Sequence, residues 1–472
     1  MKYVTSHTSA WLVLLMPVLW LGGCSRAVSE FDIPIDMPDA FSATGNAPLP
    51  AQWWRAFRDE QLDALVAESL ADNFDLRVAW DRLVQAEAAA RKADAPLLPQ
   101  IDLTGGARRS RQESSGGTSK SSLYSLGLAA GYEVDLWSRL SSASRAAWLD
   151  AEAQRDAVDT AAITLSASVA LTWYQLAEAR SQVRIAGDQI RTNEDVLKLV
   201  DFRRNQGVAR AADSYRQRQL VAATKAQLIV AEEAVELLQY QLSVLIGNKP
   251  ELAWQDVTIG FPDLPPIPAL GMPAEVLLRR PDVRRGYRQI QAADQRLAAA
   301  IADQYPRISI SASVETSSTT SVRDLFDDWL ANLAANAIQP LFDADRRKAE
   351  VQRQKAVVAE RVDLWSQTIL GSLEDVEGAL TRQRQQALLL ENIEHQLDLA
   401  RQTYSRNLES FRVGQVDYIR VLESLQSLQS LERNVVTARR TLIQRHIDLY
   451  RSIAGPCDLT RPAQAGENTY EQ

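Results

Sequence analysis

The residue types that most often perform chemistry in proteins are scarce in this sequence. It has only three histidines, His7, His395 and His446, and only two cysteines, Cys24 and Cys457. That is too few for a Cys/His metal cluster or a disulfide framework. The sequence also lacks a glycine-rich phosphate loop, a nucleophile elbow and an HExxH motif. We therefore predict no catalytic residue and no metal, and we expect His395 and His446 to be surface or packing residues.

The neighbours of Cys24 indicate a covalent modification. Lys2 precedes an apolar run over residues 10–21, and two glycines lead into the cysteine. This pattern is typical of a secretory signal peptide, and the run is too short to span a bilayer well. Residues 21–24 (LGGC) also look like a bacterial lipobox. We predict a signal peptide at 1–23 and a lipid on Cys24, with no other cofactor; the alternative is a plain secretory signal with an incidental cysteine.

The overall composition excludes several classes of protein. The chain has 472 residues, a formal net charge of −8 and 46% hydrophobic residues, so it has ample material for a core and is not globally disordered. It has no block of lysine and arginine, which argues against nucleic acid as a partner because phosphate binding needs concentrated positive charge.

The strongest feature of the sequence is an internal repeat. Shifting the chain by 207 residues superimposes identical residues along much of its length: Asp75 on Asp282, Arg77 on Arg284, Ala86 on Ala293, Pro99 on Pro306, Arg139 on Arg346 and Gly207 on Gly414. We predict two copies of one unit, at 53–247 and 268–455, joined by a proline-rich linker at 248–267. A lipid-anchored segment at 24–52 precedes them, and a tail at 456–472 follows.

Each copy predicts a helix, two strands and a long helical hairpin. In the first copy the helix covers 60–95, the strands about 101–137 and the hairpin about 142–247; in the second, the strands cover about 307–341 and the hairpin about 346–455. From 124 to 136 apolar and small or polar residues alternate with period two. Polar tips are expected at 113–122 and 316–321. The fourth strand, at 329–340, alternates poorly.

The alternating strands have two interpretations. They are either half-buried in a soluble sandwich or part of an outer-membrane β-barrel whose apolar face meets lipid. The predicted signal and lipid anchor favour the barrel. Known membrane barrels start at about eight strands, so four strands per chain require that several chains share the barrel.

The helical segments are unusually long. The stretches 142–205 and 346–413 would each extend about 100 Å at ~1.5 Å per residue, and each turns back at a glycine, Gly207 or Gly414. Apolar residues in the last helix follow the alternating three-and-four spacing of coiled coils. A cytoskeletal or adaptor coiled coil is one interpretation. Attachment to membrane-type strands favours a tube that continues a barrel into the periplasm.

The repeat also places opposite charges at matching positions near the two turns. Arg210 corresponds to Asp417, and Asp213 corresponds to Arg420. If first and second hairpins alternate around a ring, these residues are placed to form ion pairs that hold a closed end. The alternative is that Asp213 and Asp417 cap the return helices, a role that aspartate often fills.

Several segments together resemble the TolC-like outer-membrane factor lipoproteins. They are the lipobox, Trp53-Trp54 with Phe57, the string RRPDV at 279–283, and the tip segment 411–423 (FRVGQVDYIRVLE). The resemblance covers nearly the whole mature chain. It implies a homotrimer in which twelve strands form one transmembrane β-barrel and the antiparallel helices continue it as a coiled-coil α-barrel, so the fold class is mainly α with a small β part.

The same resemblance implies a function and a gate. The protein would be the outer-membrane channel of a tripartite efflux system, a passive duct without enzymatic activity that receives small molecules or ions from an inner-membrane pump and a periplasmic adaptor. Its periplasmic gate would include Ile419 and Glu423, which lie on one helix face at spacing i, i+4. Three copies of Glu423 would repel one another or attract cations, unless Glu423 is an ordinary solvated charge. The alternative function is a lipid-anchored periplasmic adaptor or scaffold without a pore.

Overall fold

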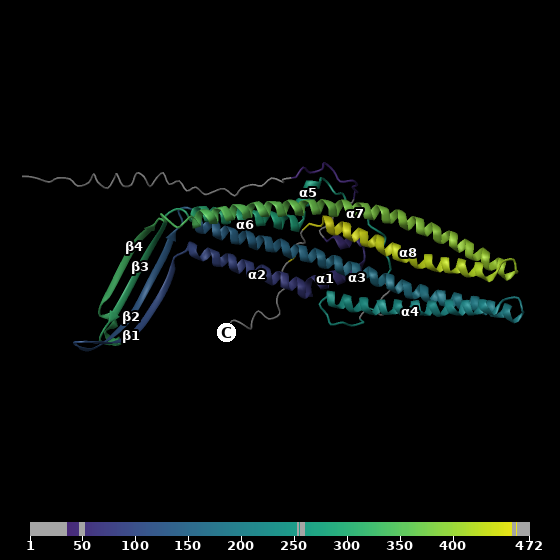
Figure 1. Ribbon diagram of the computed structural model, residues 1–472, viewed down its shortest axis with the longest axis horizontal. Coiled ribbons are helices and arrows are strands. Elements are labelled where there is room, and N and C mark those ends of the chain that lie inside the picture. The colour runs from purple at the N-terminus through teal and green to yellow at the C-terminus, as the bar shows by residue number, and fades with distance from the viewer. Residues whose placement is uncertain (1–34, 47–51, 253, 255–259, 456–458, 460–472) are drawn as a thin grey trace, which may run out of the picture. The chain divides into compact units, whose positions relative to one another are not determined.

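The computed structural model describes residues 35–46, 52–252, 254, 260–455 and 459. The predicted signal peptide, Cys24, Cys457 and almost all of the predicted tail lie outside the described residues. The described part of the chain is mainly helical and contains one antiparallel sheet (Figure 1). This confirms the predicted fold class of a mainly α protein with a small β part.

The elements follow the predicted order in both halves. The first half contains α1 (Glu60–Asp72), α2 (Phe74–Asp94), β1 (Gln100–Ser114), β2 (Gly117–Val134), α3 (Arg139–Asn205) and α4 (Ala211–Leu245). The second half contains α5 (Pro273–Arg279), α6 (Pro281–Ala302), β3 (Arg307–Ser318), β4 (Trp329–Ile338), α7 (Arg346–Arg412) and α8 (Tyr418–Ile453). Short 3-10 helices cover Trp53–Phe57, Ala95–Leu97 and Val322–Phe326. Adding 207 to both bounds of α3 gives the bounds of α7, so the internal repeat is present in the structure.

The helix predicted at 60–95 is wrong in one respect, because the chain breaks it at Asn73. The carboxamide oxygen of Asn73 accepts hydrogen bonds from the backbone N–H groups of Asp75 (2.9 Å) and Leu76 (3.1 Å), and so caps α2. Its amide nitrogen donates to the carbonyl oxygen of Leu245 at the end of α4 (3.0 Å). One buried side chain thus joins the end of α4 to the start of α2.

The second half makes the same joint with a different residue. Arg280, at the position equivalent to Asn73, donates to the carbonyl oxygen of Ser452 (2.8 Å), which is equivalent to Leu245. Its guanidinium also binds both carboxylate oxygens of Asp282 (3.1 and 2.7 Å) and one of Asp375 (3.2 Å). Arg280 and Asp282 belong to the RRPDV string, which therefore joins the end of α8 to the start of α6.

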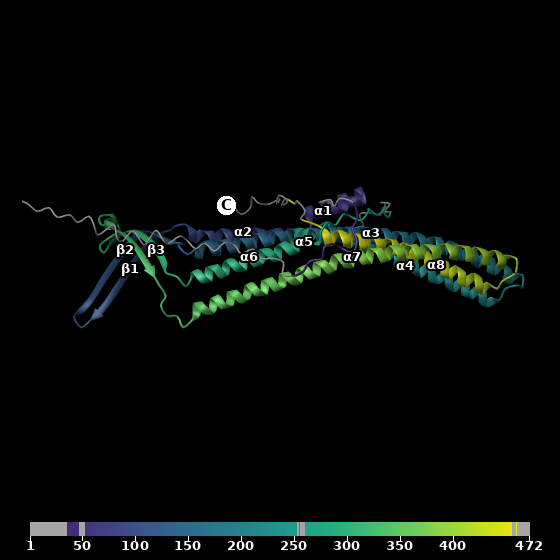
Figure 2. The same ribbon diagram turned by 90° about the horizontal axis from the view of Figure 1, so that it is seen from above.

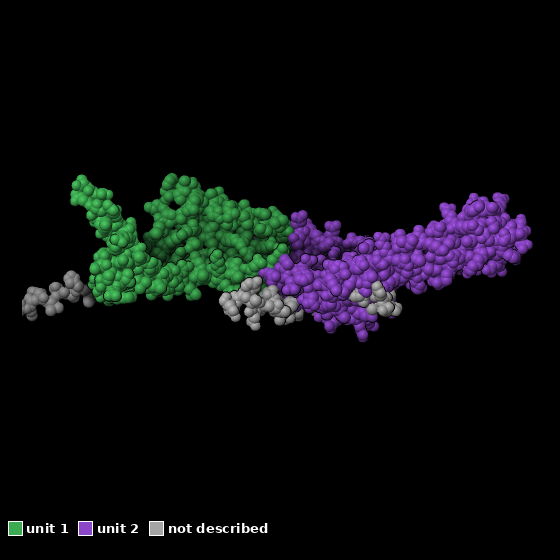
Figure 3. All heavy atoms as spheres, turned by 90° about the horizontal axis from the view of Figure 1, so that it is seen from below, with its two compact units in different colours: residues 1–34, 82–154, 285–366 green, residues 35–81, 155–284, 367–472 purple. Residues whose placement is uncertain are grey.

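The chain divides into two compact units, coloured separately in Figure 3. One unit (residues 82–154 and 285–366 among its described parts) holds the sheet, whose strand order is β1-β2-β3-β4 with every neighbouring pair antiparallel. Paired residues in a sheet point to the same face, and the register places most of the large apolar side chains on one face. The rows on this face are Val134/Ile308/Ala337, Tyr132/Ile310/Ala335, Ile101/Ala130/Ala312/Leu333, Leu103/Leu128/Val314/Ala331, Gly105/Leu126/Thr316/Trp329 and Ala107/Tyr124/Ser318.

The opposite face of the sheet is mostly small or polar, and its large apolar residues are Leu123, Leu330 and Ile338. Its rows include Asp102/Ala129/Ser313/Asn332 and Gly131/Ser311/Ala334. β4 alternates weakly because it has large apolar residues on both faces: Trp329 and Leu333 fall on the apolar face, and Leu330 and Ile338 on the opposite one. The predicted polar tip at 113–122 is wrong, because most of these residues pair within β1 and β2 and the turn occupies residues 115–116.

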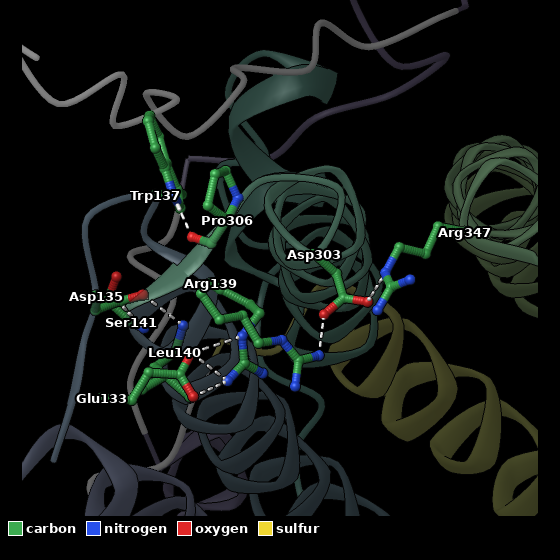
Figure 4. A network of polar contacts seen from close by, with 10 residues as sticks. Glu133, Asp135, Trp137, Arg139, Leu140, Ser141, Asp303, Pro306 and Arg347 are labelled. Carbon is green, nitrogen blue, oxygen red and sulfur yellow. Dashed lines mark hydrogen bonds and ion pairs between the residues drawn. The ribbon is translucent and has the colours of Figure 1, made fainter. Parts of the chain in front are cut away.

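Side-chain contacts fix the junctions between strands and helices (Figure 4). The carboxylate of Asp135 accepts hydrogen bonds from the backbone N–H groups of Leu140 (3.0 Å) and Ser141 (2.8 Å), at the start of α3. The indole nitrogen of Trp137 donates to the carbonyl oxygen of Pro306 (2.8 Å). These contacts hold β2, β3 and the start of α3 together at the end of the sheet from which the long helices leave.

The second unit (residues 35–81, 155–284 and 367–472, as far as they are described) contains α4, α8 and the larger parts of α3 and α7, which form the two helical hairpins α3–α4 and α7–α8. Both hairpin turns lie at the same end of this unit (Figure 1). None of the described helices is both long enough and apolar enough to cross a membrane.

An aromatic cluster packs against α8 in this unit. Trp53 stacks on Tyr450 with ring centroids 6.0 Å apart, and Phe57 contacts the buried His446 edge-on at 6.0 Å. The cluster therefore anchors the N-terminal segment of the unit to the last helix.

Candidate functional site

The two predicted hairpin turns have the same backbone geometry. Gly207 and Gly414 have φ angles of 78° and 85°, in the left-handed region that glycine adopts at low cost. In the first turn the N–H of Gly207 donates to the carbonyl of Arg204 (2.9 Å), and the N–H of Val208 to that of Arg203 (3.0 Å). The second turn repeats both bonds at equivalent positions, so each long helix ends in a Schellman motif.

The charged residues beside the two turns have different surroundings. Arg210 is the N-cap residue of α4, and its backbone N–H donates to the carboxylate of Asp213 (3.2 Å). Asp213 also lies 3.8 Å from the guanidinium of Arg216. Asp417 is the N-cap residue of α8, but its exposed side chain makes no capping hydrogen bond. The capping alternative therefore holds for Asp213, at the third position of its helix, and fails for the Asp417 side chain.

Neither predicted ion pair forms between the two hairpins of one chain. Arg210, Asp417 and Arg420 are all exposed at the tips, and none of them makes a salt bridge with a described residue. Within one chain, these side chains are left available to another partner.

Ile419 and Glu423 lie in the first two turns of α8. Ile419 is 39% exposed, and Glu423 is exposed one turn further on. Their neighbours on the helix, Val421 and Leu422, are buried. The helix thus faces its apolar side to the hairpin core and leaves Ile419 and Glu423 on the accessible side.

A contact that the sequence analysis missed connects the two tips within the chain. Arg203, in the last turn of α3, donates hydrogen bonds to the carbonyl oxygens of Phe411 and Arg412 (3.3 Å for the second) at the end of α7. Its guanidinium carbon also lies 4.4 Å from the centroid of the Phe411 ring. One side chain therefore gives the carbonyl of Arg412 a donor, gives that of Phe411 a second donor beside the N–H of Gly414, and adds a cation–π contact.

A buried core lies directly behind this contact. It is formed by Val196, Val200, Phe411, Tyr418, Val421, Leu422 and Leu425. The hydroxyl of Tyr418 donates to the side-chain oxygen of Gln217 on α4 (2.6 Å), and the amide of Gln217 donates to the carbonyl of Asn193 on α3 (2.8 Å). Burial, and secondarily the charge of Asp213, raises the pKa of Tyr418, so the phenol stays a donor at physiological pH.

Polar contacts continue along α3 and α8 away from the tips. Asn193 and Gln429 are both buried and hydrogen-bond side chain to side chain (2.8 Å). Further along, Glu178 binds Arg440 (2.7 Å) and accepts from Thr437 (2.6 Å). Because buried polar groups are costly to separate from their partners, the contact between Asn193 and Gln429 helps to fix the register of the two helices.

Comparison with known proteins identifies the family. The model of the family described as outer membrane efflux protein matches residues 65–248 and 272–455, one match for each half of the chain. The chain belongs to the outer membrane efflux protein family. The two matches are themselves offset by 207 residues, in agreement with the internal repeat.

Relatives and solved structures agree with this membership. The chain is 31% identical to the pyoverdine export outer membrane protein OpmQ of Pseudomonas aeruginosa over 458 residues, 94% of this chain and 96% of the relative. It is 25% identical to the cation efflux system protein CusC of Escherichia coli K12, covering 93% and 97% of the two chains. Its fold matches the outer-membrane channel OprN with a TM-score of 0.85 at 23% identity, over 91% of this chain and 99% of that one.

Proposed function

We propose that this outer membrane efflux protein is the outer-membrane channel of a tripartite efflux system and works as a homotrimer. Three chains would supply twelve strands to one β-barrel, which is enough to close a membrane barrel, whereas four are not. The protein performs no chemistry of its own, and the export energy comes from a pump in the inner membrane that is joined by a periplasmic adaptor.

The two-faced sheet carries this proposal. The apolar rows run from Val134 to Tyr124, ten residue steps along β2. At about 3.4 Å per residue this is about 34 Å along the strand, or about 26 Å across the membrane at a tilt of about 40°. The apolar band of an outer-membrane barrel is about 25 Å tall. Tyr132 stands near the lower edge of the band, and Tyr124 and Trp329 near the upper edge, where aromatic girdles occur.

The predicted lipid on Cys24 adds a second membrane attachment. A single acyl chain holds a protein only weakly, and several chains anchor it stably. The chain would thus be held in the outer membrane by its barrel and its lipid, with the long helices extending into the periplasm.

The cargo is not specified by the channel fold. Relatives are named for pyoverdine export, toluene efflux and cation efflux. Since such different molecules leave through similar channels, we assign the choice of small molecule or ion to the pump and adaptor.

The experiment that tests the function is reconstitution of the full-length protein in planar bilayers. A channel predicts a heat-modifiable trimer that conducts ions. A lipid-anchored scaffold without a pore predicts a membrane-associated protein that gives no current, and that result would overturn the proposal.

We further propose that the hairpin tips form the periplasmic gate. Ile419 and Glu423 would line the constriction, and Arg210–Asp417 and Asp213–Arg420 ion pairs would form between tips of neighbouring chains. Exposed pairs contribute at most about 1 kcal/mol each, so only a ring of them biases a gate.

The charge pairs are tested by a swap. We expect Asp417→Arg to raise the single-channel open probability, because the introduced arginine would repel Arg210 of the neighbouring tip. The double variant Arg210→Asp/Asp417→Arg restores opposite charges and should restore closure. A double variant that conducts like the single one would disprove the pairing.

A further inference from the structure

The hairpin formed by β1 and β2 continues beyond the rest of the sheet. Pairing between β2 and β3 ends at Tyr124 and Ser318, whereas β1 and β2 remain paired as far as Ser114 and Gly117. Figure 2 shows this blue hairpin reaching past the green strands β3 and β4. The extension therefore lies at the end of the sheet opposite to the end at which β2 leads into α3.

On the apolar face of the sheet, the side chains change from aromatic to basic at this point. The row of Ala107 and Tyr124 is followed by the row of Arg109 and Ser122, and then by Arg111 opposite Lys120. Because side chains alternate between faces along a strand, these three basic residues point the same way as the apolar band below them.

The three basic side chains are not neutralised by the protein. All three are exposed, and none makes an ion pair with any described residue. Glu113, one row further on, is the acid on the same face, and Thr118 donates a hydrogen bond to it (3.3 Å). On this face, the projecting part of the β1–β2 hairpin therefore carries a net positive charge, although the overall charge of the chain is −8.

The height of these residues matches the headgroup layer. Arg109 lies two residues beyond Ala107, and Arg111 four, which at a tilt of about 40° is roughly 5 and 10 Å above the top apolar row. The polar layer on each side of a bilayer is roughly 5–8 Å thick, from a ~30 Å core within a total of ~40–45 Å. The row of Arg109 thus stands within the polar layer. The row of Arg111 and Lys120 stands just above it, from where these long side chains can extend back to the lipid phosphates.

We propose that Arg109, Arg111 and Lys120 bind the phosphate groups of anionic lipids in the outer leaflet of the membrane. This inference rests on the proposed function, because it requires the apolar face to meet lipid. Arginine presents a planar set of donors that matches phosphate oxygens, and clustered basic residues attract anionic lipid surfaces. Bound lipid would hold the projecting hairpin against the membrane surface.

Arg108 provides a matched control for this test. It lies next to Arg109 on the same strand but points to the opposite face, where its partner is Leu123. The two arginines therefore share exposure and strand position and differ in the side of the sheet that they face.

The test titrates the full-length protein in neutral detergent with short-chain phosphatidylglycerol and with the matching phosphatidylcholine, counting bound lipid by native mass spectrometry. We expect a preference for phosphatidylglycerol that weakens in about 0.5 M salt. R109Q should bind phosphatidylglycerol about fivefold more weakly, and R109Q/R111Q/K120Q about a hundredfold more weakly. R108Q should stay within about twofold of the wild type. If the triple variant does not fold, the single-variant comparison decides.

Three results would overturn the lipid site: equal binding of the two lipids, equal losses in R108Q and R109Q, or displacement of lipid by inorganic phosphate at the same concentration. The last would identify a free-phosphate site instead. Planar-bilayer currents of the same samples separate this inference from the proposed function. A wild type that conducts without lipid preference refutes the lipid site alone, whereas a wild type that gives no current refutes the channel.

Discussion

At the scale of single residues, the tip of the molecule depends on Arg203. This side chain connects α3 to the terminal carbonyls of α7 and covers the Phe411 ring, which is itself 3% exposed. The position equivalent to Arg203 in the second repeat is Ser410. The contact is therefore one-sided: the first hairpin holds the second, and the described residues form no symmetrical contact that could replace it.

We expect Arg203→Gln to favour the open channel. Hydrogen bonds from a charged group contribute about 1.5–3 kcal/mol, so their loss should raise the ratio of open to closed channels about tenfold or more in single-channel recordings. Arg204→Gln is the control, because the side-chain contacts of Arg204 with described residues stay on its own helix, to Asp201 (3.9 Å) and Asn205 (3.5 Å). Equal open probabilities for the two variants would contradict a role for the Arg203 contact in closure.

His446 makes the folded state sensitive to acid. Burial lowers the pKa of His446 to about 4, and neither ring nitrogen has a hydrogen-bond partner among the described residues. Since the unfolded value is about 6.5, the unfolded chain takes up the proton first as pH falls. The folded state should therefore lose up to about 3 kcal/mol between pH 6.5 and 4.

Thermal unfolding measured at several pH values checks this prediction. His446→Phe should flatten the fall of the unfolding midpoint below pH 6.5, whereas His395→Phe, at an exposed position of α7, should leave it unchanged. An acid dependence that persists in full in His446→Phe would assign it to other groups.

At the scale of elements, the sequence predicted the long helices well. Glycine at each hairpin turn, proline before the first strand of each pair and period-two alternation are local signals, and they placed the helices and strands close to their observed bounds. The break at Asn73 has only a weak local signal, because asparagine is a preferred N-cap residue but is also only mildly unfavourable inside a helix. The hydrogen bond from Asn73 to the end of α4 is a tertiary contact, which no local pattern reveals.

We expect Asn73→Ala to destabilise the protein by about 2 kcal/mol, from the lost helix cap and the unsatisfied carbonyl of Leu245. Asp72→Ala, at the exposed neighbouring position, should change stability by less than about 0.5 kcal/mol. Denaturant unfolding of the two variants measures the difference. Similar losses would show that the Asn73 joint contributes little.

The difference between local patterns and tertiary contacts also explains which tip residues could be predicted from the sequence. The charges at 210, 213, 417 and 420 were visible because the repeat aligns them. Arg203 has no counterpart in the second copy, and its partners are backbone carbonyls, so neither the repeat nor a charge pattern pointed to it. Its role follows from a tertiary contact, between the end of α3 and the end of α7.

At the scale of the whole molecule, the sheet determines how the protein meets its surroundings. We expect Leu333→Arg to block assembly, because Leu333 is 80% exposed in the middle of the apolar face, and arginine at the middle of a membrane costs about 2–4 kcal/mol. Asn332→Arg changes the next residue on the opposite face and should assemble normally. The yield of heat-modifiable trimer in outer membranes measures both, and equal yields would argue against a lipid-facing apolar surface.

The matching lengths of α3 and α7, 67 residues each, constrain how this protein changes in evolution. Removing one helical turn from only one of them would shift its tip by about 5.4 Å and carry Arg203 out of reach of Phe411. Insertions and deletions should therefore survive only when both copies change by the same amount, so the duplicated halves remain tied to a common length long after their sequences have diverged.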